Sequence, residues 1–98
     1  MQNYRNLKVW VRAHEVTLRT YRATERFPEH ERYGLRSQLR RAAASVSANL
    51  AEGAARRSDA AFLSFLDVAS ASASEADYHL LLARDLGYLD AEEHLEPT

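Results

Sequence analysis

The residues best suited to binding chemistry are five arginines in the middle of the chain: Arg36, Arg40, Arg41, Arg56 and Arg57. The arginine guanidinium is a planar fork of hydrogen-bond donors that matches a phosphate group. Phosphate contacts are electrostatic, sensitive to salt and independent of base sequence. The set therefore predicts a nucleic-acid-binding face. The alternative is a solvated face whose arginines pair with acidic residues. The absence of aromatic residues between the arginines favours this alternative, because a groove for single-stranded nucleic acid usually combines both residue types.

Three further polar residues are expected to have structural roles. Asn49 lies on the apolar seam of the same predicted helix, where one polar residue usually fixes the register of packed helices; ligand binding is the alternative. Glu52 lies beside this seam and four residues before Arg56, the order that favours a helical ion pair. Glu75 lies among apolar residues of a later helix, so its carboxylate needs a partner. We expect that partner to be Arg41, in the same chain or in a neighbouring subunit.

The residue types used for catalysis or metal binding form no recognisable pattern. None of the four histidines lies three or four residues from another, and the Glu-x-x-His motif of di-iron bundles is absent. No glycine-rich phosphate loop and no nucleophile motif is found. We therefore expect no catalytic residue, no cofactor and no metal, and we expect that the protein is not an enzyme.

Length and composition restrict the fold. A chain of 98 residues is expected to form a single domain over residues 1–98. Only three glycines and two prolines, with abundant alanine, leucine, arginine and glutamate, favour an all-α protein. The N-terminus lacks the apolar core of a signal peptide, and no stretch approaches the ~20 apolar residues that span a bilayer. The absence of cysteine fits a reducing compartment, so we expect a cytoplasmic protein. The absence of a spanning stretch leads us to expect no membrane contact.

Charge is distributed unevenly along the chain. Residues 1–57 carry 12 Lys and Arg against 5 Asp and Glu, a net +7, whereas residues 58–98 carry 1 against 9, a net −8. The formal net charge of −1 hides this difference. Either the two halves neutralise each other, within or between subunits, or the basic half binds an anionic partner.

Hydrophobic periodicity predicts three long helices, each with apolar residues at alternating steps of 4 and 3. The central helix covers residues 35–53, with the seam Leu35, Leu39, Ala42, Val46, Asn49 and Gly53. A first helix over residues 6–24 carries the stripe Leu7, Val11, His14, Leu18 and Tyr21. A third helix over residues 58–87 has the seam Phe62, Leu66, Ala69, Ala73, Ala76, Leu80, Ala83 and Gly87. Small residues on these seams indicate close packing.

The sequence also predicts where the third helix begins and ends, and which residues of the central helix point outward. Ser58 is a good cap for the start of the third helix, and Gly87 suits its end. In projection down the central helix, Arg36, Arg40, Ser47 and Arg57 point away from the seam.

The third helix is apolar over more than half of its circumference, so it needs cover on two sides. The first two helices supply one side. The segment Asp90-Ala91-Glu92-Glu93 has the pattern of a capping box, but Pro97 ends the following helix after about one turn. We expect an up-down antiparallel bundle of three long helices and a truncated fourth, which assembles as a homo-oligomer to cover the remaining apolar surface.

A family resemblance is carried by an ordered set of motifs: Leu7-Lys8-Val9-Trp10, Phe27-Pro28-Glu29, Tyr33-Gly34-Leu35, Gln38-Leu39-Arg40-Arg41-Ala42-Ala43, Asn49-Leu50-Ala51-Glu52-Gly53 and Leu86-Gly87-Tyr88-Leu89. With Phe62-Leu63 and Phe65-Leu66, they resemble the four-helix-bundle proteins called 23S ribosomal RNA intervening-sequence proteins. The resemblance implies an up-down bundle that forms a ring-like homopentamer. In a related branch, accessory proteins of diversity-generating retroelements engage a reverse transcriptase and its RNA through a basic surface. The chain departs from the pattern at residues 69–72 and in its short fourth helix.

Two functions follow from these patterns. The first is a non-enzymatic homo-oligomer that binds RNA, or a nucleoprotein partner such as a reverse transcriptase, through the basic half. The second is a purely structural assembly module, in which the basic half of one subunit packs on the acidic half of the next. A basic face on the assembled ring favours the first, and a neutralised surface favours the second.

Overall fold

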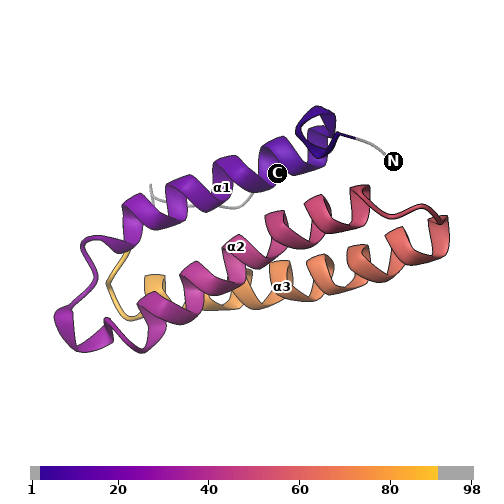
Figure 1. Ribbon diagram of the computed structural model, residues 1–98. Coiled ribbons are helices and arrows are strands. Elements are labelled where there is room, and N and C mark those ends of the chain that lie inside the picture. The colour runs from indigo at the N-terminus through magenta and orange to yellow at the C-terminus, as the bar shows by residue number, and fades with distance from the viewer. Residues whose placement is uncertain (1–2, 91–98) are drawn as a thin grey trace.

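The computed structural model describes residues 3–90 and consists of three long antiparallel helices (Figure 1). They are α1 (Lys8–Thr24), α2 (Leu35–Ala54) and α3 (Asp59–Asp85), with short 3-10 turns η1 (Tyr4–Asn6) before α1 and η2 (Glu29–Glu31) before α2. The part of the chain that is described contains no strand, which confirms the all-α prediction. The predicted capping box and fourth helix lie outside this part, apart from Asp90. None of the described helices is both long and apolar enough to cross a bilayer.

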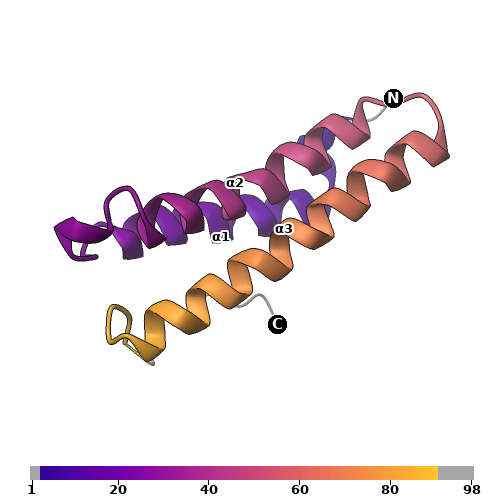
Figure 2. The same ribbon diagram turned by 90° about the horizontal axis from the view of Figure 1, so that it is seen from below.

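Helix α2 lies in the middle of the molecule. It packs against α1 on one side and α3 on the other, whereas α1 and α3 approach each other little. The result is an elongated body of 43 × 21 × 18 Å. Figure 2 shows that α3 diverges from α2 towards the C-terminal end of α3.

Small and large residues produce this divergence. At the narrow end, a Cβ on Gly53 would lie 2.9 Å from the Phe62 ring and 3.0 Å from Phe65 Cβ, so only glycine allows the close approach. At the wide end, the buried side chains of Phe27 and Leu89 fill the space between the helices. The cluster of buried core residues therefore lies towards the end where α2 begins.

The local signals at both ends of α3 are confirmed. The Ser58 hydroxyl accepts a hydrogen bond from the Ala61 N–H at 3.1 Å and so caps the first turn. Gly87, just after the last turn, has φ +81°, a left-handed conformation that glycine adopts without a side-chain clash.

The buried face of α1 differs from the predicted stripe, which was wrong. Leu18 and Tyr21 are 41% and 42% exposed, whereas Thr20 and Thr24 are fully buried and Ala23 nearly so. Short side chains on this face let α1 approach the alanine-rich α2 closely. Larger apolar side chains of α1, among them Val11, Leu18 and Tyr21, consequently remain exposed.

The seam of α2 is confirmed at Leu35, Leu39 and Ala42, which are buried. Ser47 was predicted to point outward and is instead buried, because α2 has a second inner face against α1. There Thr17 Oγ1 lies 3.2 Å from the Ser47 hydroxyl. A helix packed on two sides buries residues that a single-seam projection places outside.

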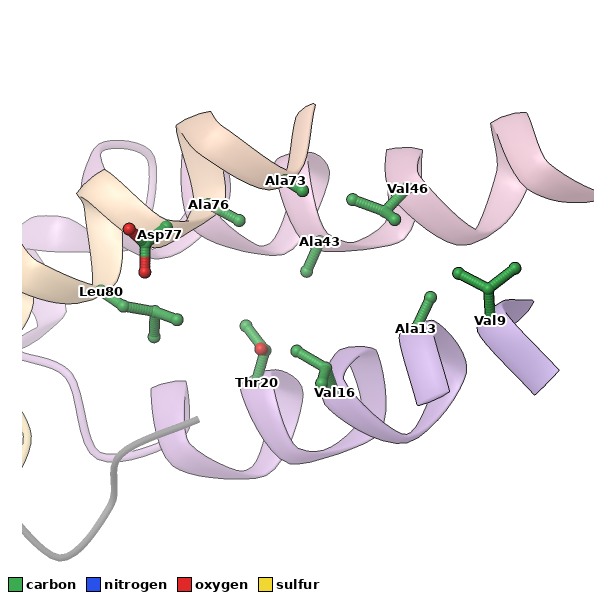
Figure 3. Close-up of a pocket in the computed structure, with 10 residues that line it drawn as sticks. All are labelled: Val9, Ala13, Val16, Thr20, Ala43, Val46, Ala73, Ala76, Asp77 and Leu80. Atoms are coloured by element: carbon green, nitrogen blue, oxygen red, sulfur yellow. The ribbon is translucent and has the colours of Figure 1, made fainter. Parts of the chain in front are cut away.

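An apolar groove separates α1 from α3 (Figure 3). Its volume is about 230 Å³, and its lining includes Val16 and Thr20 from α1, Val46 from α2 and Leu80 from α3. The Thr20 hydroxyl oxygen is buried and has no hydrogen-bond partner among the described residues. The three helices therefore leave apolar surface uncovered along one side of the bundle.

Candidate nucleic-acid interface

A polar hollow of about 540 Å³ lies where α1 ends and α2 begins. It is lined by Tyr21, Arg32, Tyr33, Arg36, Ser37, Arg40 and Arg41. We call it the basic hollow. Four of its side chains are arginines, including three that the sequence assigned to nucleic-acid binding, and it is open to solvent.

The segment before α2 is fixed by a carboxylate cap. Glu31 Oε1 accepts the Leu35 N–H at 3.0 Å, and Glu31 Oε2 accepts the Tyr88 hydroxyl at 3.0 Å. The first bond satisfies a free N–H at the start of α2, and the second ties this loop to the chain beyond α3. The cap therefore holds in place the loop that carries Arg32 and Tyr33.

These contacts shift two pKa values. The hydrogen bond from the Leu35 N–H, followed by the one from Tyr88, lowers the pKa of Glu31 below its ordinary value. The hydrogen bond to Glu31 raises the pKa of Tyr88, because the tyrosine must keep its proton to donate. Both shifts are explained by a structural cap.

Arg40 is bound within the protein. Its Nε donates to Thr24 Oγ1 at 2.7 Å, and its Nη2 donates to the Tyr21 carbonyl oxygen at 2.9 Å and to Glu25 Oε1 at 3.0 Å. The guanidinium also lies 4.6 Å from the centre of the Tyr21 ring. Arg40 thus joins the last turn of α1 to α2, and few of its donors face the hollow.

The other arginines of the basic hollow keep more of their donors available. Arg36 reaches Glu25 only at 3.6 Å, and Arg32 is paired with the exposed Glu29 at 3.3 Å. Arg41 is exposed, and within residues 3–90 its side chain makes no ion pair or hydrogen bond. Arg36 and Arg41 are therefore the best placed to bind an anion.

Two tyrosines of the hollow were missed by the sequence reasoning, which found no aromatic residue among the arginines. Tyr33 is 87% exposed, and the guanidinium of Arg32 lies 5.6 Å from the centre of its ring. Tyr21 comes from α1 and reaches the hollow only because α1 packs on α2. The short spacing of Tyr33 and Arg36 along the chain could have revealed that Tyr33 belongs to the hollow. The pairing of Tyr21 with Arg40 could not be found in this way, because it depends on how α1 packs on α2.

Arg56 and Arg57 lie at the opposite end of α2, about 22 Å from Arg41 at 1.5 Å per helical residue. Arg56 Nε donates to the Glu52 backbone oxygen at 3.0 Å, and its guanidinium lies 5.1 Å from the centre of the Phe65 ring. Arg57 lines a smaller hollow of about 120 Å³. The five predicted arginines therefore form two separate groups.

The predicted structural residues of α2 have specific partners. Asn49 Nδ2 donates to the Ser45 carbonyl and hydroxyl oxygens at 2.8 and 3.0 Å, and the Ser45 hydroxyl lies 2.9 Å from that of Ser72 on α3. This chain of hydrogen bonds links α2 to α3, and it is consistent with the role in fixing helix register that was predicted for Asn49. Glu52 is exposed, and Arg56 binds its backbone oxygen in place of the expected ion pair.

The predicted contact between Glu75 and Arg41 is wrong within this chain. The Glu75 side chain is 58% exposed, and its Oε2 lies 3.9 Å from Nδ1 of His79. Arg41 lies in the basic hollow, beside α1 and Tyr21. A contact between two subunits stays a prediction.

Comparison with known proteins agrees with the motifs. A family model of the 23S rRNA-intervening sequence protein matches residues 5–97. No curated protein is similar enough in sequence to count as a match. Among residues 3–90, no three His, Asp or Glu side chains come close enough together to hold a metal ion.

Proposed function

Because the chain belongs to the 23S rRNA-intervening sequence protein family, we propose that it is a non-enzymatic homo-oligomer that binds RNA through the basic hollow. The RNA is either free or part of a nucleoprotein such as a reverse transcriptase complex. The observation that carries the proposal is the gathering of four arginines and two tyrosines around one open hollow.

The charges of the hollow support binding to a polyanion. Arg36 and Arg40 share a single carboxylate, that of Glu25, while Arg41 has no acidic partner among the described residues. The guanidinium groups consequently exceed the carboxylates in this part of the surface. Phosphate groups supply the missing negative charge, and guanidinium forks match their geometry.

Assembly is the second part of the proposal. The apolar groove and the outward apolar side chains of α1 and α3 support cover by a fourth helix or by further copies of the chain. By resemblance to its family we propose a homopentamer. A ring would repeat the basic hollow on every subunit and so raise the avidity for a long RNA.

The purely structural assembly module is favoured by one specific contact. Glu25 already compensates part of the charge of Arg36 and Arg40, as neutralisation of the basic half would require. The acidic α3 of a neighbouring subunit would then cover the rest. Assembly without any RNA binding is the expected behaviour of such a module.

RNA binding is tested by fluorescence anisotropy with a labelled RNA over a range of salt concentrations. We expect log affinity to fall linearly with log salt. The double variant Arg36→Gln/Arg41→Gln should lower the magnitude of this slope by about 1.4, or about 0.7 for each lost phosphate contact. Arg84→Gln is the matched control, since Arg84 lies on α3 and pairs with Asp85. Absence of binding even at low salt would leave the structural module as the function.

A further inference from the structure

The side chain of Tyr33 has no evident role in folding. It is 87% exposed, and within the described residues its ring packs only against the guanidinium of Arg32. It is followed by Gly34 and by Leu35, whose buried side chain anchors the start of α2. The Glu31 cap fixes this loop, so the Tyr33 ring is presented at the edge of the basic hollow.

Cationic donors lie around the same hollow. Arg41 is exposed and has no partner among residues 3–90, and Arg36 is held only by the 3.6 Å contact with Glu25. A nucleotide has one flat face and one charged group. An aromatic ring beside guanidinium groups can bind both at once, by stacking on the base and by hydrogen bonding to the phosphate.

From this arrangement we infer that the basic hollow is selective for unpaired RNA, with Tyr33 as the stacking platform for a base and Arg36 and Arg41 as phosphate contacts. The inference rests on the proposed function and adds its substrate class. In a duplex the bases are stacked and paired, so the tyrosine ring finds no exposed base face. Only the phosphate contacts then remain, and binding is weaker.

The experiment compares one labelled RNA strand with the same strand annealed to its complement. In anisotropy titrations with the intact protein, Tyr33→Ala should weaken binding of the single strand by between about 5-fold and 150-fold. Binding of the duplex should change less than about twofold. Tyr33→Phe keeps the ring and should keep single-strand affinity. Tyr78→Ala, which removes an exposed tyrosine of α3 far along the chain from the hollow, is the control and should change neither.

The outcomes separate the two proposals. If the wild-type protein binds neither RNA at low salt, the proposed function itself fails. If it binds both forms equally, or if Tyr33→Ala weakens both forms by the same factor, the hollow binds phosphates alone and the inference is overturned while RNA binding stands. Because Tyr33 is exposed, circular dichroism should show the same helix content in the wild type and in all three tyrosine variants.

Discussion

At the scale of single residues, the arginines of α2 differ in what they do. Arg40 has an 18% exposed side chain and donates to three oxygens on the last turns of α1. Arg41, its neighbour in sequence, is exposed and has no such partners among the described residues. Two adjacent arginines thus have different roles, one in joining helices and one in offering a free charge.

This difference predicts unequal effects of the same conservative substitution. Arg40→Lys keeps the charge but loses the planar fork that reaches several oxygens, so it should lower the free energy of unfolding by about 1–3 kcal/mol. Arg41→Lys is the matched control and should stay within about 0.5 kcal/mol of the wild type. Urea denaturation followed by circular dichroism, at equal protein concentrations, measures both. Equal stability of Arg40→Lys and the wild type would show that the observed hydrogen bonds contribute little.

Which side chains come together was harder to predict than which residues are polar. Three of the hollow's four arginines, Arg36, Arg40 and Arg41, were identified from the sequence, because they lie close together on one helix and their chemistry depends on residue type alone. Tyr21 joins them from another helix, fifteen residues before Arg36 in sequence. The partnership of Arg40 with Thr24 depends likewise on the packing of α1. Contacts between helices are not encoded in the spacing along either one.

At the scale of elements, the start of α2 depends on a carboxylate that precedes it. Both carboxylate oxygens of Glu31 accept a hydrogen bond, one from the Leu35 N–H and one from the Tyr88 hydroxyl. A Cβ on Gly34 would lie 2.7 Å from Glu31 Oε1, so any larger residue at this position would require the capping carboxylate to shift. One side chain therefore joins the loop, the helix start and the segment after α3.

The cap makes stability depend on pH in a defined direction. The pKa of Glu31 is lowered in the folded protein, so its contribution is present above the unfolded pKa of about 4.5 and is lost as pH falls through the folded pKa. We expect the difference in Tm between the wild type and Glu31→Gln to be largest near neutral pH and to shrink below about pH 4.5. Glu29→Gln, which removes a neighbouring carboxylate that caps no helix, is the control. A difference that does not change with pH would contradict this role of the ionised carboxylate.

The ends of the helices were predicted more accurately than the faces that they bury. Ser58 and Gly87 mark the ends of α3 through interactions of each residue with its own neighbouring backbone, so the sequence alone was sufficient. The buried face of α1 was not predictable in this way. Its periodicity suggested Leu18 and Tyr21, yet the close packing of α1 on alanine-rich α2 selects the threonine face.

At the scale of the whole molecule, apolar surface remains outside the core of a single chain. Leu18 of α1, Val68 of α3 and Leu86 just after α3 are each about half exposed, and the groove between α1 and α3 is open. The broad apolar arc predicted for α3 is therefore not covered by α1 and α2. A small bundle gains stability when such surface is buried against another chain.

Val68 tests whether copies of the chain supply this cover. It lies on the arc of α3 that neither α1 nor α2 covers, and it is 48% exposed. If this arc is an interface, Val68→Glu places a charge against apolar side chains of the neighbouring subunit and should raise the dissociation constant of the assembly about tenfold or more. Ser74→Glu adds the same charge on the polar sector of α3 and should leave assembly unchanged. Sedimentation velocity over a range of concentrations measures both. A wild-type protein that stays monomeric at micromolar concentration would contradict the proposed homo-oligomer, whereas a Val68→Glu protein that assembles normally would place the interface on another face.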